Sequence, residues 1–177
     1  MAPRPAPDLD ARREQVVSSA RRVAEAEGWT AVTMRRVASE LGVTQPVLYS
    51  VFSGRQALVD AVALDGFADL ADALEAAESE SGPRIRAYLD FATTHPRVYE
   101  AMFSLPSGLP FASGDIPAPL QRAFTAVAAV FPGDDESRAE VAWATLHGLA
   151  TLQAGGRLRA SHVEARIALA QHLLGGA

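Results

Sequence analysis

Apolar residues recur along the chain at the three- and four-residue spacing of helices. Val16, Ala20 and Val23 share one helical face, and Gly28 follows as a residue suited to a helix end. We find no convincing run in which apolar and polar residues alternate, as they do in a half-buried strand, and no internal repeat. The pattern predicts an all-α protein of about nine helices.

Two short helices are predicted near the N-terminus. Thr33 is placed to cap a helix over 34–41, and Gly42 can adopt the left-handed conformation that ends it. Thr44 is placed to cap the next helix, whose first turn contains Pro46, a position where a missing N–H group costs little. These lengths and this tight turn are typical of a helix-turn-helix, whose second helix enters the major groove of DNA.

Further boundaries follow from local signals. Ser53 and Gln56 have the spacing of a capping box that opens a long helix, and Gly82–Pro83 is expected to end that helix near residue 81. A second capping box, from Ser161 to Glu164, is expected to open the last helix. Asp8 or Asp10 is expected to cap the first helix, and Asp134 or Asp135 the eighth.

Composition and charge narrow the class of protein. The 177 residues are 49% hydrophobic and 21% charged, as in folded globular chains. No cysteine is present, which excludes a disulfide scaffold, a thiolate metal site and a cysteine nucleophile. The net charge is −5, yet residues 1–60 carry eight arginines against seven acidic residues, so any anionic partner is expected to meet the N-terminal part.

The sequence predicts no membrane segment. The longest apolar run, Phe124–Phe131, is far shorter than the ~20 residues that a spanning helix needs. Residues 1–7 contain three prolines and are expected to form a flexible arm, and no apolar core of a secretory signal follows them. We therefore expect a cytoplasmic protein.

The helix-turn-helix segment also matches a known family. From Thr33 to Leu58 it reads TMRRVASELGVTQPVLYSVFSGRQAL, which resembles the DNA-binding signature of the TetR family of transcriptional repressors. Val51 stands where that family often has His or Tyr, and Arg55 stands where Lys is usual. The resemblance implies a DNA-binding domain over residues 8–53, and an effector-binding and dimerisation domain over residues 54–177.

The expected DNA contacts lie on the two short helices. Gln45 has the amide group that can pair with adenine N6 and N7, and Pro46 or Val47 can touch a thymine methyl group. The resemblance implies that the Tyr49 hydroxyl reaches a phosphate, while Thr33 has capping as its alternative role and the arginines have a solvated surface as theirs. The full predicted set is Thr33, Arg35, Arg36, Thr44, Gln45, Pro46, Val47, Tyr49, Ser50 and Arg55.

The C-terminal part carries a less specific resemblance. The stretches WATLHGL, from Trp143, and HPRVYEAMF, from His95, look like the Trp–His–Gly group of TetR-family C-terminal domains. This implies a homodimer held by the last two helices and a pocket for a small, largely apolar effector. The candidate lining residues, each of which could equally be core, are Phe67, Tyr88, Phe91, Tyr99, Met102, Phe103, Phe124, Val127, Trp143 and His147.

Other functions have less support in the sequence. The chain has no His-Glu-x-x-His motif, no Gly-rich phosphate loop and no Gly-x-Ser-x-Gly motif, so we predict no catalytic residues, no metal and no cofactor. A helical adaptor that has lost operator binding remains the alternative, because the chain is acidic overall. The predicted function is a sequence-specific transcriptional regulator, by family default a repressor, that binds a pseudo-palindromic duplex.

Overall fold

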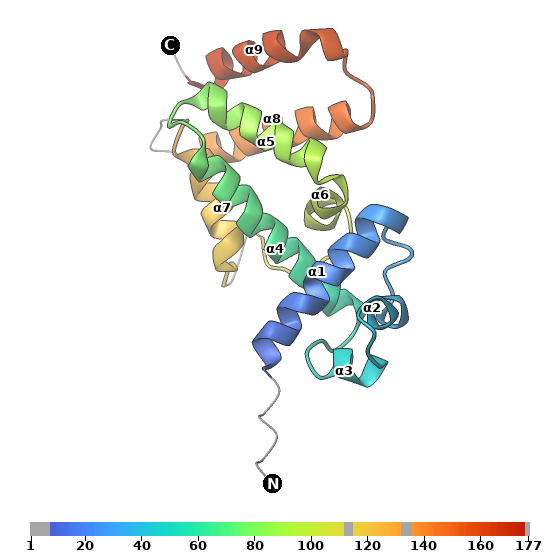
Figure 1. Cartoon of the computed structure of the whole chain (residues 1–177). Coiled ribbons are helices and arrows are strands. Elements are labelled where there is room, and N and C mark those ends of the chain that lie inside the picture. The colour runs from blue at the N-terminus through green and yellow to red at the C-terminus, as the bar shows by residue number, and fades with distance from the viewer. Residues whose placement is uncertain (1–7, 112–114, 132–135, 176–177) are drawn as a thin grey trace. The chain divides into compact units, whose positions relative to one another are not determined.

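The computed structural model describes residues 8–111, 115–131 and 136–175, and the regular elements of these residues are all helices, joined by turns and loops, without strands (Figure 1). The all-α prediction of about nine helices is therefore confirmed. The helices are α1 (Leu9–Glu27), α2 (Met34–Glu40), α3 (Gln45–Tyr49), α4 (Arg55–Ala76), α5 (Ser81–Thr94), α6 (Pro96–Phe103), α7 (Ala118–Ala128), α8 (Glu136–Ala154) and α9 (Val163–Gly175), with a short 3-10 turn over Ala160–His162.

The chain folds into two compact units. The head unit comprises the described residues up to Ala63 together with Arg97–Leu109. The body unit comprises Leu64–Pro96 and the described residues from Pro110 onward. The boundary between the two units falls within α4, between Ala63 and Leu64. The predicted functional division between residues 53 and 54 stays a prediction.

Local signals explain the start of the head unit. The Asp8 carboxylate accepts a hydrogen bond from the backbone N–H of Ala11 at 3.0 Å, so Asp8 is the cap of α1. Gly28 ends α1 with a φ of 81°, which favours glycine. Next to it, the indole N–H of Trp29 donates to the backbone carbonyl of Arg97 at 2.8 Å, so α6 is tied to the end of α1.

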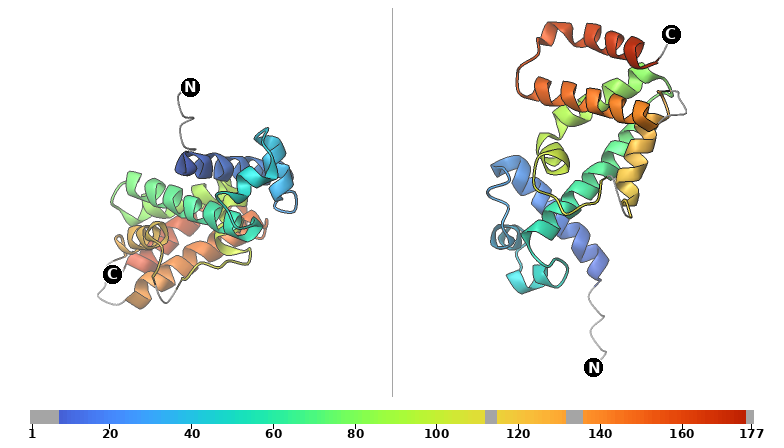
Figure 2. Two further views of the ribbon diagram at one scale, coloured as in Figure 1. Left: turned by 90° about the horizontal axis from the view of Figure 1, so that it is seen from below. Right: turned by 180° about the vertical axis from the view of Figure 1, so that it is seen from behind.

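The body unit is built around α5 and α8. Helix α5 packs against α8 and α9, and α7 packs against α8. Helices α8 and α9 lie side by side in the views of Figures 1 and 2, where they are drawn in orange and red. Arg86 on α5 makes a two-point ion pair with Glu164 on α9, at 2.5 and 2.9 Å. Ile167, Ala170 and Leu174 form the buried face of α9.

Three boundaries differ from the sequence prediction. Helix α4 ends at Ala76, and Gly82–Pro83 lies inside the first turn of α5 rather than breaking α4. Proline is tolerated there because N–H groups in the first turn have no partner within the helix. The predicted box at Ser161 is also wrong, since residues 160–162 form a 3-10 turn and Glu164 pairs with Arg86 instead.

The capping box predicted for Ser53 and Gln56 also differs from the structure. The Gln56 amide N–H donates to the Asp60 carboxylate at 2.9 Å and to the Pro106 carbonyl at 2.8 Å, so it turns forward along α4. Asp134 and Asp135, predicted to cap α8, lie outside the described residues, as does the predicted arm 1–7. Within the part of the chain that is described, no helix is long and apolar enough to cross a membrane.

Candidate nucleic-acid interface

The turn between α2 and α3 is held by backbone hydrogen bonds. Gly42 has a φ of 64°, and the N–H of Val43 donates to the carbonyl of Ala38 at 3.0 Å. At the start of α2, the Thr33 hydroxyl accepts from the backbone N–H of Arg36 at 3.1 Å. The capping role predicted for Thr33 is therefore confirmed, and its predicted phosphate contact stays a prediction.

Helix α3 has one buried side and one exposed side. Leu48 is fully buried in the head unit, whereas Gln45, Pro46 and Tyr49 are exposed, the last at 53%. The five-residue helix thus offers polar and aromatic groups outward while Leu48 holds it to the head.

The remaining predicted residues of this segment fall around that surface. Thr44 is exposed, and no side-chain capping bond joins its hydroxyl to α3, so its cap is weaker than predicted. Val47 is half-buried, and the Ser50 hydroxyl donates to the carbonyl of Val47 at 2.7 Å. The exposed surface at the start of α3 therefore includes Thr44, Gln45, Pro46 and Tyr49. The Ser50 hydroxyl is hydrogen-bonded within the helix instead.

The three predicted arginines differ in their surroundings. Arg36 is held by Glu27, at 2.6 Å, and by Glu40, at 2.8 Å. The hydrogen bond to Glu27, followed by the one to Glu40, raises the pKa of Arg36 above its ordinary value. Arg35 is exposed, and its side chain makes no hydrogen bond or ion pair with the described residues. Arg55 donates to the backbone carbonyls of Val32 and Trp29, each at 2.8 Å.

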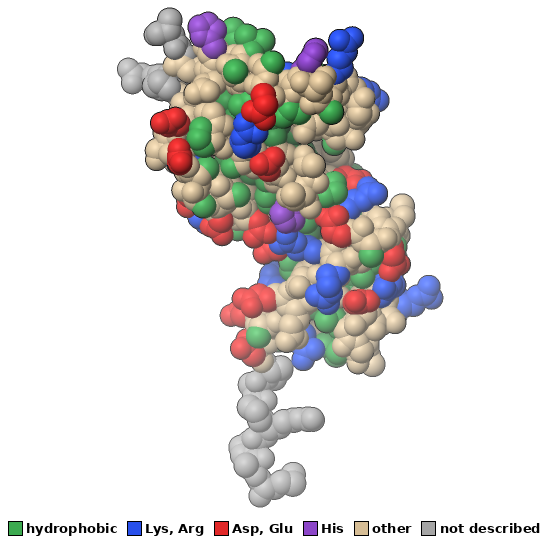
Figure 3. Space-filling view, turned by 45° about the horizontal axis from the view of Figure 1, so that its top comes forward, with side chains coloured by type: hydrophobic (Ala, Val, Ile, Leu, Met, Phe, Trp, Pro, Cys, Tyr) green, Lys and Arg blue, Asp and Glu red, His purple; other side chains and the backbone are tan. Residues whose placement is uncertain are grey.

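Sequence reasoning missed Arg13 as a residue of this region. Its guanidinium lies 4.3 Å from the centre of the Phe52 ring, and it donates to the carbonyl of Val51 at 3.1 Å. Arg13 and Val51 are 38 positions apart, so no local pattern could indicate this contact. On the face shown in Figure 3, basic and acidic side chains are interspersed, without a broad field of one sign.

Four of the ten predicted effector residues, Phe67, Tyr88, Phe124 and Trp143, form an aromatic cluster in the body unit. The indole N–H of Trp143 donates to the Tyr88 hydroxyl at 3.1 Å, and the Trp143 ring stacks on Phe124 with centroids 5.2 Å apart. Phe67 meets Trp143 edge-on at 6.4 Å, and Phe67 and Tyr88 are fully buried. Phe111, a residue that sequence reasoning missed, meets Phe67 edge-on at 6.0 Å and is 42% exposed.

The other predicted effector residues are distributed differently. Phe91 stacks on His95 at 4.9 Å, and Val127 is buried. His147 is half-buried on α8, where burial lowers its pKa. Tyr99, Met102 and Phe103 belong to the head unit, with the rings of Tyr99 and Phe103 4.7 Å apart.

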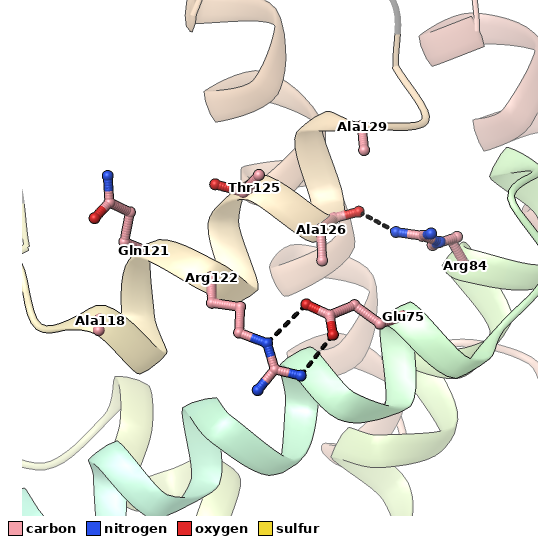
Figure 4. Close-up of a pocket in the computed structure, with 8 residues that line it drawn as sticks. All are labelled: Glu75, Arg84, Ala118, Gln121, Arg122, Thr125, Ala126 and Ala129. Atoms are coloured by element: carbon pink, nitrogen blue, oxygen red, sulfur yellow. Dashed lines mark hydrogen bonds and ion pairs between the residues drawn. The ribbon is translucent and has the colours of Figure 1, made fainter.

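A groove of about 490 Å³ lies elsewhere in the body unit, along one face of α7 (Figure 4). Its lining residues are Glu75, Arg84, Ala118, Gln121, Arg122, Thr125, Ala126 and Ala129. Arg122 pairs with Glu75 and Asp72, and Arg84 donates to the carbonyl of Ala126 at 2.8 Å. The predicted effector residues do not line this groove, and its cationic groups are already bound to protein oxygens. Among the described residues, no group of acidic or histidine side chains is arranged to hold a metal ion.

Comparison with known proteins agrees with this geometry. Residues 16–62 match the family of bacterial regulatory proteins called tetR, and residues 85–176 match the tetracyclin repressor-like C-terminal domain. The second match alone spans more than half of the chain. The chain therefore belongs to the TetR family of transcriptional regulators, as the sequence predicted, while the Trp–His–Gly group stays a prediction.

Individual relatives are more distant. The uncharacterized HTH-type transcriptional regulator YobS of Bacillus subtilis (strain 168) is 29% identical over 101 residues, which are 54% of this chain and 53% of that protein. The chain thus spans about half the length of this curated relative.

Solved structures match over more of the chain. A protein of unknown function from Rhodococcus sp. RHA1 is 27% identical, with a TM-score of 0.72 over 99% of this chain and 97% of that one. A tetR-family regulator from Streptomyces coelicolor, 19% identical, shares the fold with a TM-score of 0.65 over 93% of this chain and 78% of that one.

Proposed function

We propose that this protein is a homodimeric, sequence-specific DNA-binding regulator that represses transcription from a pseudo-palindromic operator and is released by a small, largely apolar effector. The observation that carries the proposal is the two-sidedness of α3. Leu48 is fully buried, while Gln45, Pro46 and Tyr49 are exposed on the same five-residue helix. A helix that projects polar groups from a rigid head suits the major groove of a duplex.

The exposed groups of α3 suggest a division of roles. The Gln45 amide carries one acceptor and two donors, so it can bind adenine N6 and N7 together. Pro46 and Val47 offer apolar surface to a thymine methyl group. Thr44, Tyr49 and the exposed Arg35 are proposed to bind phosphate oxygens, which position the helix without reading sequence.

A second copy of the chain is the proposed partner of the body unit. Val141 and Leu152, on α8, are 58% and 41% exposed, and Leu169 and Leu173, on α9, are 56% and 68% exposed. Val141 and Leu152 are eleven positions apart, which is close to three helical turns, so they share a face of α8. A two-fold dimer through these faces would cover the aliphatic groups and present two copies of α3 to half-sites roughly 34–36 Å apart.

The proposed effector site is the aromatic cluster of Phe67, Tyr88, Phe124 and Trp143. Large aromatic surfaces with a few polar tips are typical of small-molecule pockets. In the described state these rings pack against one another, with Phe111 over Phe67. We propose that an effector binds better to a conformation in which Phe111 is displaced, and that this conformation binds DNA less well. The proposal includes no catalytic step and places the protein in the cytoplasm.

Selection of duplexes from a random pool tests base reading directly. The wild type is expected to enrich a palindromic sequence, and Gln45→Ala is expected to lose the preference at one position of each half-site, by roughly 1–3 kcal/mol. Gln121→Ala, an exposed glutamine on α7 in the body unit, is the matched control and should enrich the wild-type sequence. Enrichment of no sequence by the wild type would contradict the proposal.

The adaptor alternative predicts a different response to salt. Binding through several phosphate contacts weakens steeply as salt is added, because each contact releases counterions from the duplex. Pairing with a protein through apolar helices does not. A wild type that binds a protein partner with little salt dependence, and binds no duplex, would favour the adaptor.

A further inference from the structure

Two arginines of the head unit are bound to its own backbone, and both hold segments that flank the helix-turn-helix. We propose that Arg55 and Arg13 are positioning residues, which set the orientation of α3, rather than ligands of DNA phosphate. We call this pair the arginine brace. The inference rests on the proposed DNA binding for its functional part, and on hydrogen bonds within the head unit for its structural part.

Arg55 closes the turn between α1 and α2. Its Nε and Nη2 atoms each donate at 2.8 Å, to the carbonyls of Val32 and Trp29. A planar guanidinium is suited to this task because its donors form a fixed fork, whereas a lysine ammonium acts as a single point charge. Val32 is fully buried and Trp29 is 5% exposed, so the fork joins the first residue of α4 to a segment embedded in the core.

Arg13 closes the connection between α3 and α4. Its guanidinium lies over the Phe52 ring at 4.3 Å, and its Nη1 atom donates to the Val51 carbonyl at 3.1 Å. The backbone N–H of Phe52 donates to the carbonyl of Leu48 on α3 at 2.9 Å. Arg13 therefore holds, from α1, the residues that directly follow α3.

The two contacts constrain α3 through the segments that flank the helix-turn-helix. Arg55 fixes the turn before α2, and Arg13 fixes the connection after α3. If Arg55 turned its Nε and Nη2 atoms to a phosphate, the Val32 carbonyl would lose this donor and the Trp29 carbonyl would keep only the longer bond from the Val32 N–H, at 3.3 Å. The loss of these two hydrogen bonds carries a free-energy penalty. Arg35 differs from both, because it is exposed on α2 and its side chain makes no hydrogen bond or ion pair with the described residues.

The salt dependence of DNA binding distinguishes the two roles. The dissociation constant of the full-length protein is measured against mixed-sequence duplex DNA over a range of salt concentrations, for the wild type, Arg55→Gln and Arg35→Gln. Loss of one phosphate contact lowers the slope of log K against log salt by about 0.9. We expect Arg35→Gln to lower the slope by about that amount, and Arg55→Gln to leave it unchanged while weakening binding about tenfold through loss of hydrogen bonds.

Unfolding of the free protein supplies the second readout. Arg55→Gln keeps one amide donor for a carbonyl and is chosen because Arg55→Ala is more prone to unfold. We expect Arg55→Gln and Arg13→Gln to unfold at clearly lower denaturant concentration than the wild type, and Arg35→Gln to unfold with the wild type. The brace is overturned if Arg55→Gln lowers the salt slope by about 0.9, or if it unfolds at the wild-type midpoint.

Failure of the arginine brace and failure of the proposed function give different results. If the wild type binds no duplex at any salt concentration, the proposed function fails, and the brace is judged by the unfolding midpoints alone. If the wild type binds DNA and Arg55→Gln lowers the slope, the function stands and the brace fails.

Discussion

The head and body units both leave side chains exposed that a folded monomer does not need, and the chemistry of those side chains differs. The head exposes a glutamine, a proline and a tyrosine on the five residues of α3. The body exposes four aliphatic residues on the two longer helices α8 and α9. Groups that donate and accept hydrogen bonds suit the edges of base pairs, whereas aliphatic faces gain from being covered by another apolar surface. The contrast supports the proposal of two kinds of partner for one chain.

The largest expected effect comes from charging the aliphatic face of α9. Leu169→Asp combined with Leu173→Asp should convert a dimer to monomers, since carboxylates would be buried in an apolar interface. DNA affinity should then fall about a hundredfold or more, because the second half-site is no longer tethered to the first. Sedimentation and DNA titration measure both effects.

Leu9→Asp is the control for this experiment, since Leu9 is 50% exposed in the head unit. It should leave the mass of the assembly unchanged. A double variant on α9 that stays dimeric would show that the exposed aliphatic face has another role.

Substitutions at two neighbouring residues of α3 test whether its buried and exposed sides have separate roles. Leu48→Ala should lower the free energy of unfolding by about 3 kcal/mol, since Leu48 is fully buried. Tyr49→Ala should change it by less than about 0.5 kcal/mol, as at most exposed sites. Tyr49→Ala should instead weaken DNA binding about tenfold through loss of a phosphate hydrogen bond. Equal losses of stability in the two variants, measured by denaturation, would mean that Tyr49 is part of the core.

A buried hydroxyl in the head allows a stabilising substitution. Ser19 is fully buried on α1, and its hydroxyl has no hydrogen-bond partner among the described residues. Ser19→Ala should raise the free energy of unfolding by about 1 kcal/mol, because an unsatisfied buried hydroxyl carries a desolvation penalty. Ser18→Ala is the control, since exposed Ser18 accepts from Arg22 at 3.0 Å and should matter little. A destabilised Ser19→Ala variant would show that the hydroxyl is satisfied in solution.

Substitution of His147, which is half-buried on α8 in the body unit, should have the smallest effect on the free energy of unfolding. Burial lowers the pKa of His147 below its ordinary value of 6.5, so the unfolded chain binds a proton more readily than the folded one. The stability that His147 contributes is therefore present above pH 6.5 and is lost as the pH falls through the lowered pKa. His147→Gln should flatten the dependence of unfolding on pH below that value, while His162→Gln, at an exposed position, is the control.

Features governed by neighbouring residues were determined by the sequence. The cap at Asp8, the cap at Thr33 and the left-handed glycines 28 and 42 depend on hydrogen bonds and backbone preferences that extend over only a few residues. The sequence also predicted the exposed start of α3, because Pro46 suits the first turn of a helix and Leu48 follows two positions later as an apolar residue.

Only the tertiary structure decided how the charged and aromatic side chains are used. Arg55 reaches carbonyls 23 and 26 positions away, Glu164 meets Arg86 across 78 positions, and Phe111 covers Phe67 from a segment far along the chain. Long side chains bind the acceptors that packing brings near them, and packing depends on every helix at once. Gly82, in the first turn of α5, also lies next to the side chain of Gln171 on α9, a neighbour that the local sequence could not indicate.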